Sequence, residues 1–282
     1  MPVLLSGLVL LAACQQAPQT TPDVVLVESG KIAADPADPA WQQAPRHVAP
    51  LLPQDLVEPR QLQTTTAQVT VQGMTDGEAA AFRLSWSDDA VDDVPGPARF
   101  ADACAVQLPR QPGPDLPAPQ MGEGGRPVEI VLWRATWQAV VDGRAREEIA
   151  DLYPRAAIDH YPFRAPALQE GSPEQQEMAR RYAPARALGN PMAGPRQRPV
   201  ETLVALGPGT LTPDPSLAAD GRGVYDVGQQ AWSVVLVRPL GEELRSTGRT
   251  QAAFAVWQGS RGETGARKMR TGWVPVATER KR

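Results

Sequence analysis

The feature that most constrains the fold of this chain is a series of short segments in which apolar and polar residues alternate. In the stretch AAFRLSWSDD, Phe82, Leu84 and Trp86 fall on one side of an extended chain, and Arg83 and Ser85 fall on the other. A period of two is typical of a β-strand that buries one face and exposes the other. The segment therefore predicts a half-buried strand over residues 80–89.

A second alternating segment, AQVTVQGM at 67–74, lies just before the first one, and the spacer between them contains Asp76-Gly77. Asp-Gly is a strong turn signal between two strands, so the pair is predicted to form a hairpin. Further strands are expected at RPVEIVLWRATWQ (126–138), RPVETLVALGPGTLT (198–212), QAWSVVLVRPL (230–240), QAAFAVWQGS (251–260) and TGWVPVATE (271–279). The last of these contains a proline and is expected at a sheet edge.

Proline and glycine are abundant in this chain, with 30 and 24 residues among 282. Because proline is poorly tolerated in helix interiors and central strands, this composition indicates many turns and long loops. Helices are expected only at 143–153 and 171–190, where Ser172 and Gln175 form a capping-box pattern and Pro184 ends or kinks the helix. The predicted fold is mostly β, an antiparallel, immunoglobulin-like β-sandwich with a few short helices and long Pro/Gly-rich loops.

The N-terminus reads as a bacterial lipoprotein signal, because a short apolar run ends in small residues before Cys14 and a polar stretch follows. Residues 1–14 are then the signal, residues 15–30 a tether, and residues 31–282 a single sandwich domain. Cys14 is the expected lipidation site, so the protein is expected in the periplasm, held to the membrane by a lipid anchor. Cys104 is then the remaining cysteine and is expected to be a buried apolar residue.

Several functional classes find no support in the sequence. The net charge of −4 provides no basic stripe for nucleic acid. The sequence contains no G-x-S-x-G, H-E-x-x-H or Walker motif, and no C-x-x-C-H for covalent haem attachment. The acidic pairs Asp88-Asp89 and Asp92-Asp93 are interpreted as solvated loop residues.

Lysine is rare in this chain. Of 28 basic residues only Lys31, Lys268 and Lys281 are lysines, and Lys268 alone lies in the body of the protein. Arginine is effectively always protonated, whereas a lysine that loses its proton can donate a lone pair to a metal. Met121 lies in a Pro/Gly loop before an apolar strand, where a methionine is either core filler or an axial haem ligand. On these residues alone, Lys268 is either a solvated loop residue or a metal ligand.

Six stretches of the chain, in this order, resemble a known family. That family comprises the haem b-binding gamma subunits of type II dimethyl-sulfoxide-reductase-family molybdenum enzymes, such as ethylbenzene dehydrogenase, dimethyl sulfide dehydrogenase, selenate reductase and chlorate reductase. The stretches are DPADPAWQQAP (35–45), FRLSWSDD (82–89), QMGEGGRPVEIVLWRATW (120–137), ALGNPMAGPRQRPVETLVALGPGTLT (187–212), GQQAWSVVLVRPL (228–240) and AFAVWQGSRGETGARKMRTGW (253–273).

The resemblance implies a β-sandwich that holds one non-covalent haem b between two axial ligands, here Met121 and Lys268. Aromatic residues are expected to wall the haem pocket, among them Trp133 and Trp257, with Trp86, Trp137 and Phe254 as further candidates. Such a subunit is not catalytic alone. It passes electrons between a molybdenum catalytic subunit, through an iron–sulfur subunit of the same heterotrimer, and a periplasmic cytochrome c or similar redox partner.

Two alternatives are open at this point. A haem-free β-sandwich lipoprotein could bind carbohydrate or a protein partner, since similar sandwiches serve many functions and exposed tryptophans in a groove suit sugar stacking. A haem could instead be held by His47 and His160, the two histidines of the chain.

Overall fold

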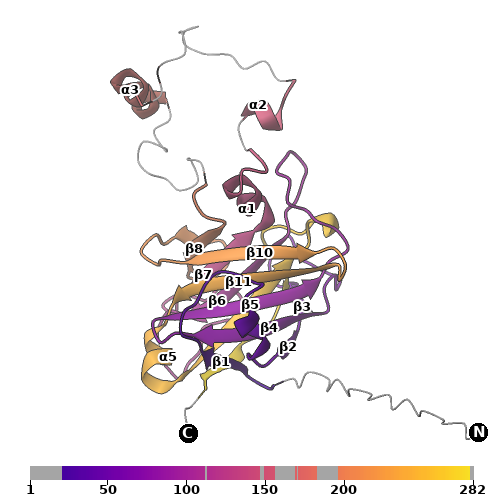
Figure 1. Cartoon of the computed structure of the whole chain (residues 1–282), viewed down its shortest axis with the longest axis vertical. Coiled ribbons are helices and arrows are strands. Elements are labelled where there is room, and N and C mark those ends of the chain that lie inside the picture. Colours follow the sequence, from indigo (N-terminus) through magenta and orange to yellow (C-terminus); the bar gives the residue numbers. More distant parts are fainter. Residues whose placement is uncertain are drawn as a thin grey trace, which may run out of the picture.

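A computed structural model describes residues 21–111, 113–146, 149–155, 169, 171–182 and 196–279. The chain forms two β-sheets packed face to face, with helices above one end of the sheets (Figure 1). The mostly β fold and the sandwich architecture predicted from the sequence are confirmed. None of the helices in the described ranges is long and apolar enough to cross a membrane.

The first sheet, sheet I, has the strand order β10-β11-β5-β4-β1-β14-β12, and β2 also pairs with β4. Its strands are β1 (Val24–Glu28), β2 (His47–Pro50), β4 (Gln68–Thr75), β5 (Ala79–Ser87), β10 (Asp220–Asp226), β11 (Ala231–Pro239), β12 (Arg249–Trp257) and β14 (Val274–Thr278). The predicted hairpin is confirmed as the antiparallel pair β4 and β5.

The second sheet, sheet II, has the order β12-β6-β7-β8-β9, and β13 and β3 extend it beyond β12. Its additional strands are β3 (Leu52–Pro53), β6 (Ala103–Pro109), β7 (Val128–Arg134), β8 (Val200–Ala205), β9 (Thr212–Pro213) and β13 (Met269–Arg270). Strand β12 belongs to both sheets: residues 249–252 pair with β14, and residues 253–257 pair with β6.

The core lies between the two sheets and follows the period of two. Phe82, Leu84 and Trp86 of β5 point into it, as the alternation predicted, and they meet Phe254 and Val256 of β12. The Phe82 and Phe254 rings contact edge to face with their centroids 6.0 Å apart. Burial of such large apolar side chains, each removing on the order of 150–250 Å² from water, provides most of the driving force for this packing.

Two parts of sheet I differ from the sequence-based expectation. Residues 24–28, predicted as part of a tether, form β1, which pairs in parallel with both β14 and β4. Strand β14 is therefore an internal strand and not the edge strand that Pro275 suggested. The proline is tolerated because pairing with β1 begins only at Val276, one residue beyond it.

The helices are short. The strand predicted for 126–138 ends at Arg134, and residues Ala135–Val141 form helix α1. Helix α2 (Ile149–Leu152) lies within the predicted segment 143–153, and α3 (Pro173–Tyr182) lies within 171–190. The backbone N–H of Gln175 donates to Ser172 Oγ at 3.2 Å, as the capping pattern predicted. Helix α5 (Glu242–Thr247) precedes β12 and was not predicted.

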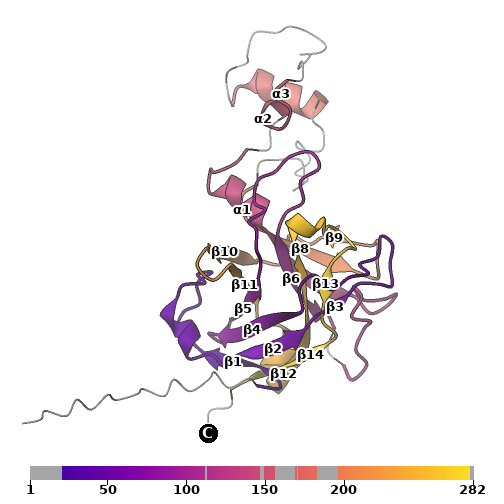
Figure 2. The ribbon, with the colours of Figure 1, turned by 90° about the vertical axis from the view of Figure 1, so that its right-hand side faces the viewer.

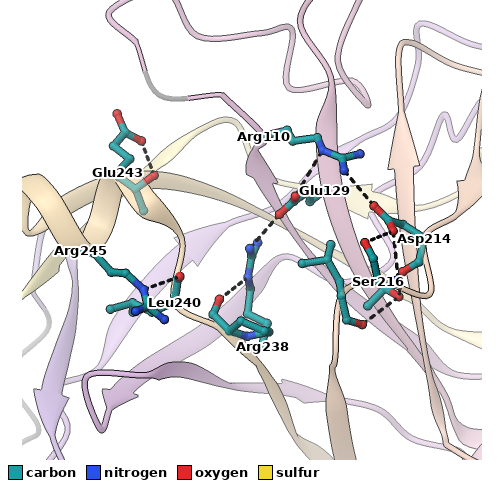
Figure 3. A network of polar contacts seen from close by, with 12 residues as sticks. Arg110, Glu129, Asp214, Ser216, Arg238, Leu240, Glu243 and Arg245 are labelled. Carbon is teal, nitrogen blue, oxygen red and sulfur yellow. Dashed lines mark hydrogen bonds and ion pairs between the residues drawn. The ribbon is translucent and has the colours of Figure 1, made fainter.

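A network of ion pairs ties the two sheets together (Figure 3). Arg238 of β11 in sheet I donates from Nη2 to Glu129 Oε2 of β7 in sheet II at 2.8 Å. Arg110 Nε lies 3.6 Å from the other oxygen of Glu129, and its Nη2 lies 3.1 Å from Asp214. Because Arg238 is buried, its charge depends on Glu129 for compensation.

Candidate functional site

A cavity of about 480 Å³ lies on the face of sheet II that points away from the core. This volume is within the usual range for small-molecule and cofactor sites. In Figure 2, β3 and β13 lie next to each other, and β13 pairs with β12, which lies between it and β6. The floor of the cavity is formed by small side chains of the neighbouring strands β6 and β12, namely Ala103, Ala105, Ala253 and Ala255.

The alternation along β6 explains this floor. Cys104 and Val106 point into the core between the sheets, so Ala103 and Ala105 must point to the opposite face. Alanine side chains leave a flat apolar surface above the strands. Larger apolar residues border it, including Ile130, Leu132, Leu203 and Trp257. The cavity is therefore suited to a flat, largely apolar ligand.

Met121 reaches this cavity from the loop before β7, and its backbone is strained. Its φ of 70° is in the left-handed region, which residues other than glycine rarely occupy. The next residue, Gly122, has a φ of 76°, and a Cβ there would lie 2.9 Å from the Arg126 carbonyl oxygen and 3.0 Å from that of Ala205. A non-glycine residue held in this conformation beside an obligatory glycine is typical of a functional site.

Backbone hydrogen bonds fix the Met121 loop. Gly207 N–H donates to the Met121 carbonyl at 2.9 Å, and Gly122 N–H donates to the Ala118 carbonyl at 2.9 Å. These bonds join the loop to itself and to the turn after β8. They hold the methionine side chain toward the cavity against the cost of its backbone conformation, which is on the order of 1–2 kcal/mol.

Lys268 meets Met121 across the cavity, although the two residues are 147 positions apart. The Lys268 Nζ atom lies 3.7 Å from the Met121 sulfur and 5.1 Å from the centre of the Trp257 ring. Burial in these surroundings, together with the nearby charge of Arg270, lowers the pKa of Lys268 to about 8. The side chain can therefore lose its proton near neutral pH and present a lone pair.

A buried carboxylate that sequence reasoning missed closes one side of the cavity. Glu263 is 1% exposed, and it accepts hydrogen bonds from Gln61 Nε2 at 2.8 Å, from the Gln258 backbone N–H at 2.8 Å and from Thr65 Oγ1. Burial raises the pKa of this carboxyl group, and the hydrogen bonds from Thr65 and Gln258 act against that rise. Glu263 fastens the 54–66 loop over the cavity, a role for which the sequence holds no local signal.

The two predicted tryptophans lie on opposite faces of sheet II. Trp257 lines the cavity, and its Nε1 donates to the Gly265 carbonyl at 3.1 Å. Trp133 points into the core between the sheets, where its Nε1 donates to Gln138 at 2.9 Å. The expectation that Trp133 lines the pocket is therefore wrong for this cavity. Helix α1 begins between Trp133 and Trp137, so the two tryptophans do not share one strand face.

Of the two rival ligands, His47 lies in the described part of the chain, and it does not line this cavity. His47 is buried beside Thr21, whose carbonyl lies 2.8 Å from its Nδ1. His160 and Cys14 lie outside the described residues. Cys104 is buried in the core as expected, and burial raises the pKa of its thiol.

The acidic pairs are not simply solvated. Asp88 is 2% exposed and Asp102 is completely buried, although Asp89 and Asp93 carry exposed ion pairs with arginines. Asp102 accepts from Trp232 Nε1 at 3.0 Å and from the backbone N–H groups of Asp92 and Gly259. Burial and the neighbouring Asp102 raise the pKa of Asp88 to about 7. Within the described ranges, no group of three His, Cys, Asp or Glu side chains is arranged to hold a metal ion.

A carbohydrate-stacking groove is not supported by the tryptophans. All seven tryptophans of the chain fall within the described residues, and each is buried or partly buried. Sugar rings stack on exposed aromatic faces, and this surface offers no exposed indole.

The cavity residues fit the haem that the resemblance implies. An amine and a thioether face each other across a cavity with a flat alanine floor, and both are donors that bind haem iron. The lowered pKa of Lys268 favours the neutral amine that iron requires. The apolar lining provides the water-poor surroundings of a non-covalent haem.

Two comparisons with known proteins identify the family of this chain. A relative from Haloferax mediterranei is 26% identical over 245 residues and carries the provisional name of a respiratory nitrate reductase heme subunit. The match covers 84% of this chain and 66% of the relative, so the chain spans slightly less than two thirds of that protein's length. The family model described as ethylbenzene dehydrogenase matches residues 38–269, a range that includes both Met121 and Lys268. The chain therefore belongs to the ethylbenzene dehydrogenase family, to whose gamma subunits its motifs are similar.

Proposed function

We propose that this protein is a b-type cytochrome subunit that holds one non-covalent haem b between Met121 and Lys268 and transfers electrons. The observation that carries the proposal is the 3.7 Å approach of the Lys268 amine and the Met121 thioether across an apolar cavity. Family membership and the heme subunit named among the relatives point the same way.

Each residue has a distinct task in this site. Lys268 gives up its proton on binding and offers a neutral amine, while Met121 offers a soft thioether that favours the reduced metal. Trp257 and the alanine floor exclude water from both donors. A haem held by Met121 and Lys268 would supply electron transfer without binding substrate at its iron. The protein is therefore not a catalyst on its own.

The setting of this electron transfer is part of the same proposal. The partners are a molybdenum catalytic subunit, an iron–sulfur subunit of one heterotrimer, and an external periplasmic cytochrome c or similar carrier. Lipidation at Cys14 anchors the protein to the membrane on the periplasmic side. Support comes from the family and from the lipoprotein-type leader in the sequence.

An absorption spectrum tests the haem and its ligands. The full chain purified from haem-supplied cells is expected to show a low-spin b-type spectrum that sharpens on reduction with dithionite. Lys268→Arg keeps the positive charge but cannot offer a lone pair, so the low-spin spectrum is expected to disappear. Met121→Ala is expected to alter it as well.

Lys31→Arg is the matched control, because Lys31 is exposed and remote from the cavity lining. Its spectrum is expected to equal that of the wild type. A wild-type protein without a Soret band contradicts the haem, and an unchanged spectrum in Lys268→Arg contradicts the ligand assignment.

A further inference from the structure

Arg270 lines the same cavity as Lys268 and lies two residues beyond it. In the short strand β13, Met269 is completely buried in the core, so the residues on either side of it face the cavity. The two cationic side chains therefore stand on one face of the strand, about 6.5–7 Å apart along the backbone. The residue paired with Arg270 on β12 is Ala255, whose short side chain leaves room above the cavity floor.

The Arg270 guanidinium is partly buried and has no carboxylate partner among the described residues. Its Nε is buried and has no hydrogen-bond partner among the described residues, and its Nη1 reaches only the Thr271 carbonyl at 3.4 Å. In the same described part of the chain, no carboxylate forms an ion pair with it. Even a partly buried guanidinium without an anionic partner is costly, and a bound anion would complete it.

The carboxylates that line the cavity, Glu263 and Glu58, have other partners than Arg270. The carboxylate of Glu263 accepts from Gln61, Thr65 and Gln258. The carboxylate of Glu58 points to solvent and pairs with Arg60 at 2.7 Å. The Lys268 side of the cavity therefore has an excess of positive charge, which complements an anionic ligand group.

We infer that Arg270 binds a propionate carboxylate of the haem, an inference that rests on the proposed function. Guanidinium matches the planar geometry of a carboxylate and forms charge-assisted, often bidentate hydrogen bonds with it. Lys268 and Arg270 thus have different roles on one strand face. The amine binds the iron, and the guanidinium fixes the orientation of the haem by binding its propionate edge. This division explains why the chain has lysine at the first position and arginine at the second.

Titration with two forms of the cofactor tests the inference. The full chain freed of haem is titrated with ferric haem and with its dimethyl ester, in which both propionates are uncharged, and the Soret band gives each dissociation constant. A charge-assisted hydrogen bond corresponds to roughly a 10- to 150-fold preference, so the wild type is expected to prefer haem by that factor. Arg270→Met keeps the aliphatic stem, and its preference is expected to fall toward one.

Arg267→Met is the matched control, because it removes an equal charge from an exposed position of the same loop. Its preference for haem is expected to equal that of the wild type. Arg270→Lys keeps the charge but loses the planar guanidinium, so it is expected to show an intermediate preference. This variant provides the test if Arg270→Met folds poorly.

The outcomes separate the two proposals. A wild type that binds haem with a low-spin spectrum but does not prefer it over the ester overturns the role of Arg270 alone. The role of Arg270 is also overturned if Arg270→Met and Arg270→Lys both keep the wild-type preference for haem. A wild type that binds neither form overturns the proposed function.

Discussion

At the residue scale, the proposed role of Lys268 requires a basic side chain that can also be neutral. The chain uses arginine at almost every other basic position, and arginine remains charged under all ordinary conditions. The cavity lowers the pKa of Lys268 to about 8, which brings the neutral amine within reach at physiological pH. The proposed function thus accounts for the one lysine in the body of the chain.

Gly122 offers a test of how the Met121 loop is positioned. Gly122→Ala places a Cβ 2.9 Å from a backbone carbonyl oxygen at a φ of 76°, so we expect a loss of at least about 1–2 kcal/mol of stability and weaker haem binding. Thermal unfolding and the haem content of the purified protein measure both effects. Gly124→Ala in the same loop meets nothing within 4 Å and is expected to change stability by less than about 0.5 kcal/mol. Equal effects of the two substitutions would refute the argument.

Asp88 predicts a pH dependence of stability. Its folded-state pKa of about 7 lies above the ordinary value of 3.8, so the folded protein binds more protons than the unfolded chain between these values. The unfolding free energy should therefore fall as the pH rises from about 4 to 7, by at most about 1.4 kcal/mol per pH unit for one proton. The raised pKa of Asp102 contributes with the same sign.

Asp88→Asn should flatten this slope, as measured by denaturant unfolding at a series of pH values. The exposed neighbour Asp89 supplies the control, because Asp89→Asn should leave the slope unchanged. If Asp88→Asn retains the full wild-type slope, the buried carboxyl group is not its source.

At the scale of the elements, the sequence predicts strands well where alternation and turn chemistry agree. β4, β5, β11 and β12 follow that rule, and the buried face of β5 is the expected one. β1 was missed because its short apolar run, VVLVE, follows a leader-like segment and pairs with partners distant in sequence. Such non-local pairing leaves no trace in local periodicity.

Some residues of the candidate site could be predicted from the sequence, and others could not. Met121 and Lys268 were identified through resemblance, and the structure brings them together. The alanine floor was not predicted, because alanine alone does not indicate a binding surface. The alternation around Cys104 and Phe254 nevertheless places these alanines on the face opposite the core. Arg270 and Glu263 were missed because their significance depends on burial and on partners from distant loops.

The ion pair between β7 and β11 predicts a stability effect at this scale. Glu129→Gln leaves the buried Arg238 without its carboxylate, so we expect a loss of roughly 3 kcal/mol in chemical denaturation. Glu177→Gln, which breaks the exposed pair with Arg180, should cost less than about 0.5 kcal/mol. A loss below 1 kcal/mol for Glu129→Gln would show that the charge of Arg238 does not depend on the Glu129 carboxylate.

At the scale of the whole molecule, the ligand cavity lies outside the sandwich core. Sheet II therefore buries both faces: one against sheet I and one beneath the cavity. This arrangement separates the residues that stabilise the fold from those that hold the ligand. Changes to the cavity floor should affect binding without disturbing the core.

Ala105 tests this separation. Ala105→Leu fills part of the cavity floor, so haem binding should weaken at least tenfold while the melting temperature of the haem-free protein stays the same or rises. Ala105→Ser keeps the volume and should bind haem nearly as the wild type does. Soret titration and thermal unfolding measure the two properties. A large loss of stability in haem-free Ala105→Leu would show that the floor is part of the folding core.

Strand β12 gives the molecule a mechanical property that neither sheet has alone. Its first half is held by β14 in sheet I, and its second half supplies half of the cavity floor in sheet II. The floor cannot open by local fraying, because the same strand anchors both layers. Amide protons of residues 253–257 should thus exchange with solvent only through global unfolding, which makes the lifetime of the bound cofactor depend on the kinetic stability of the entire fold.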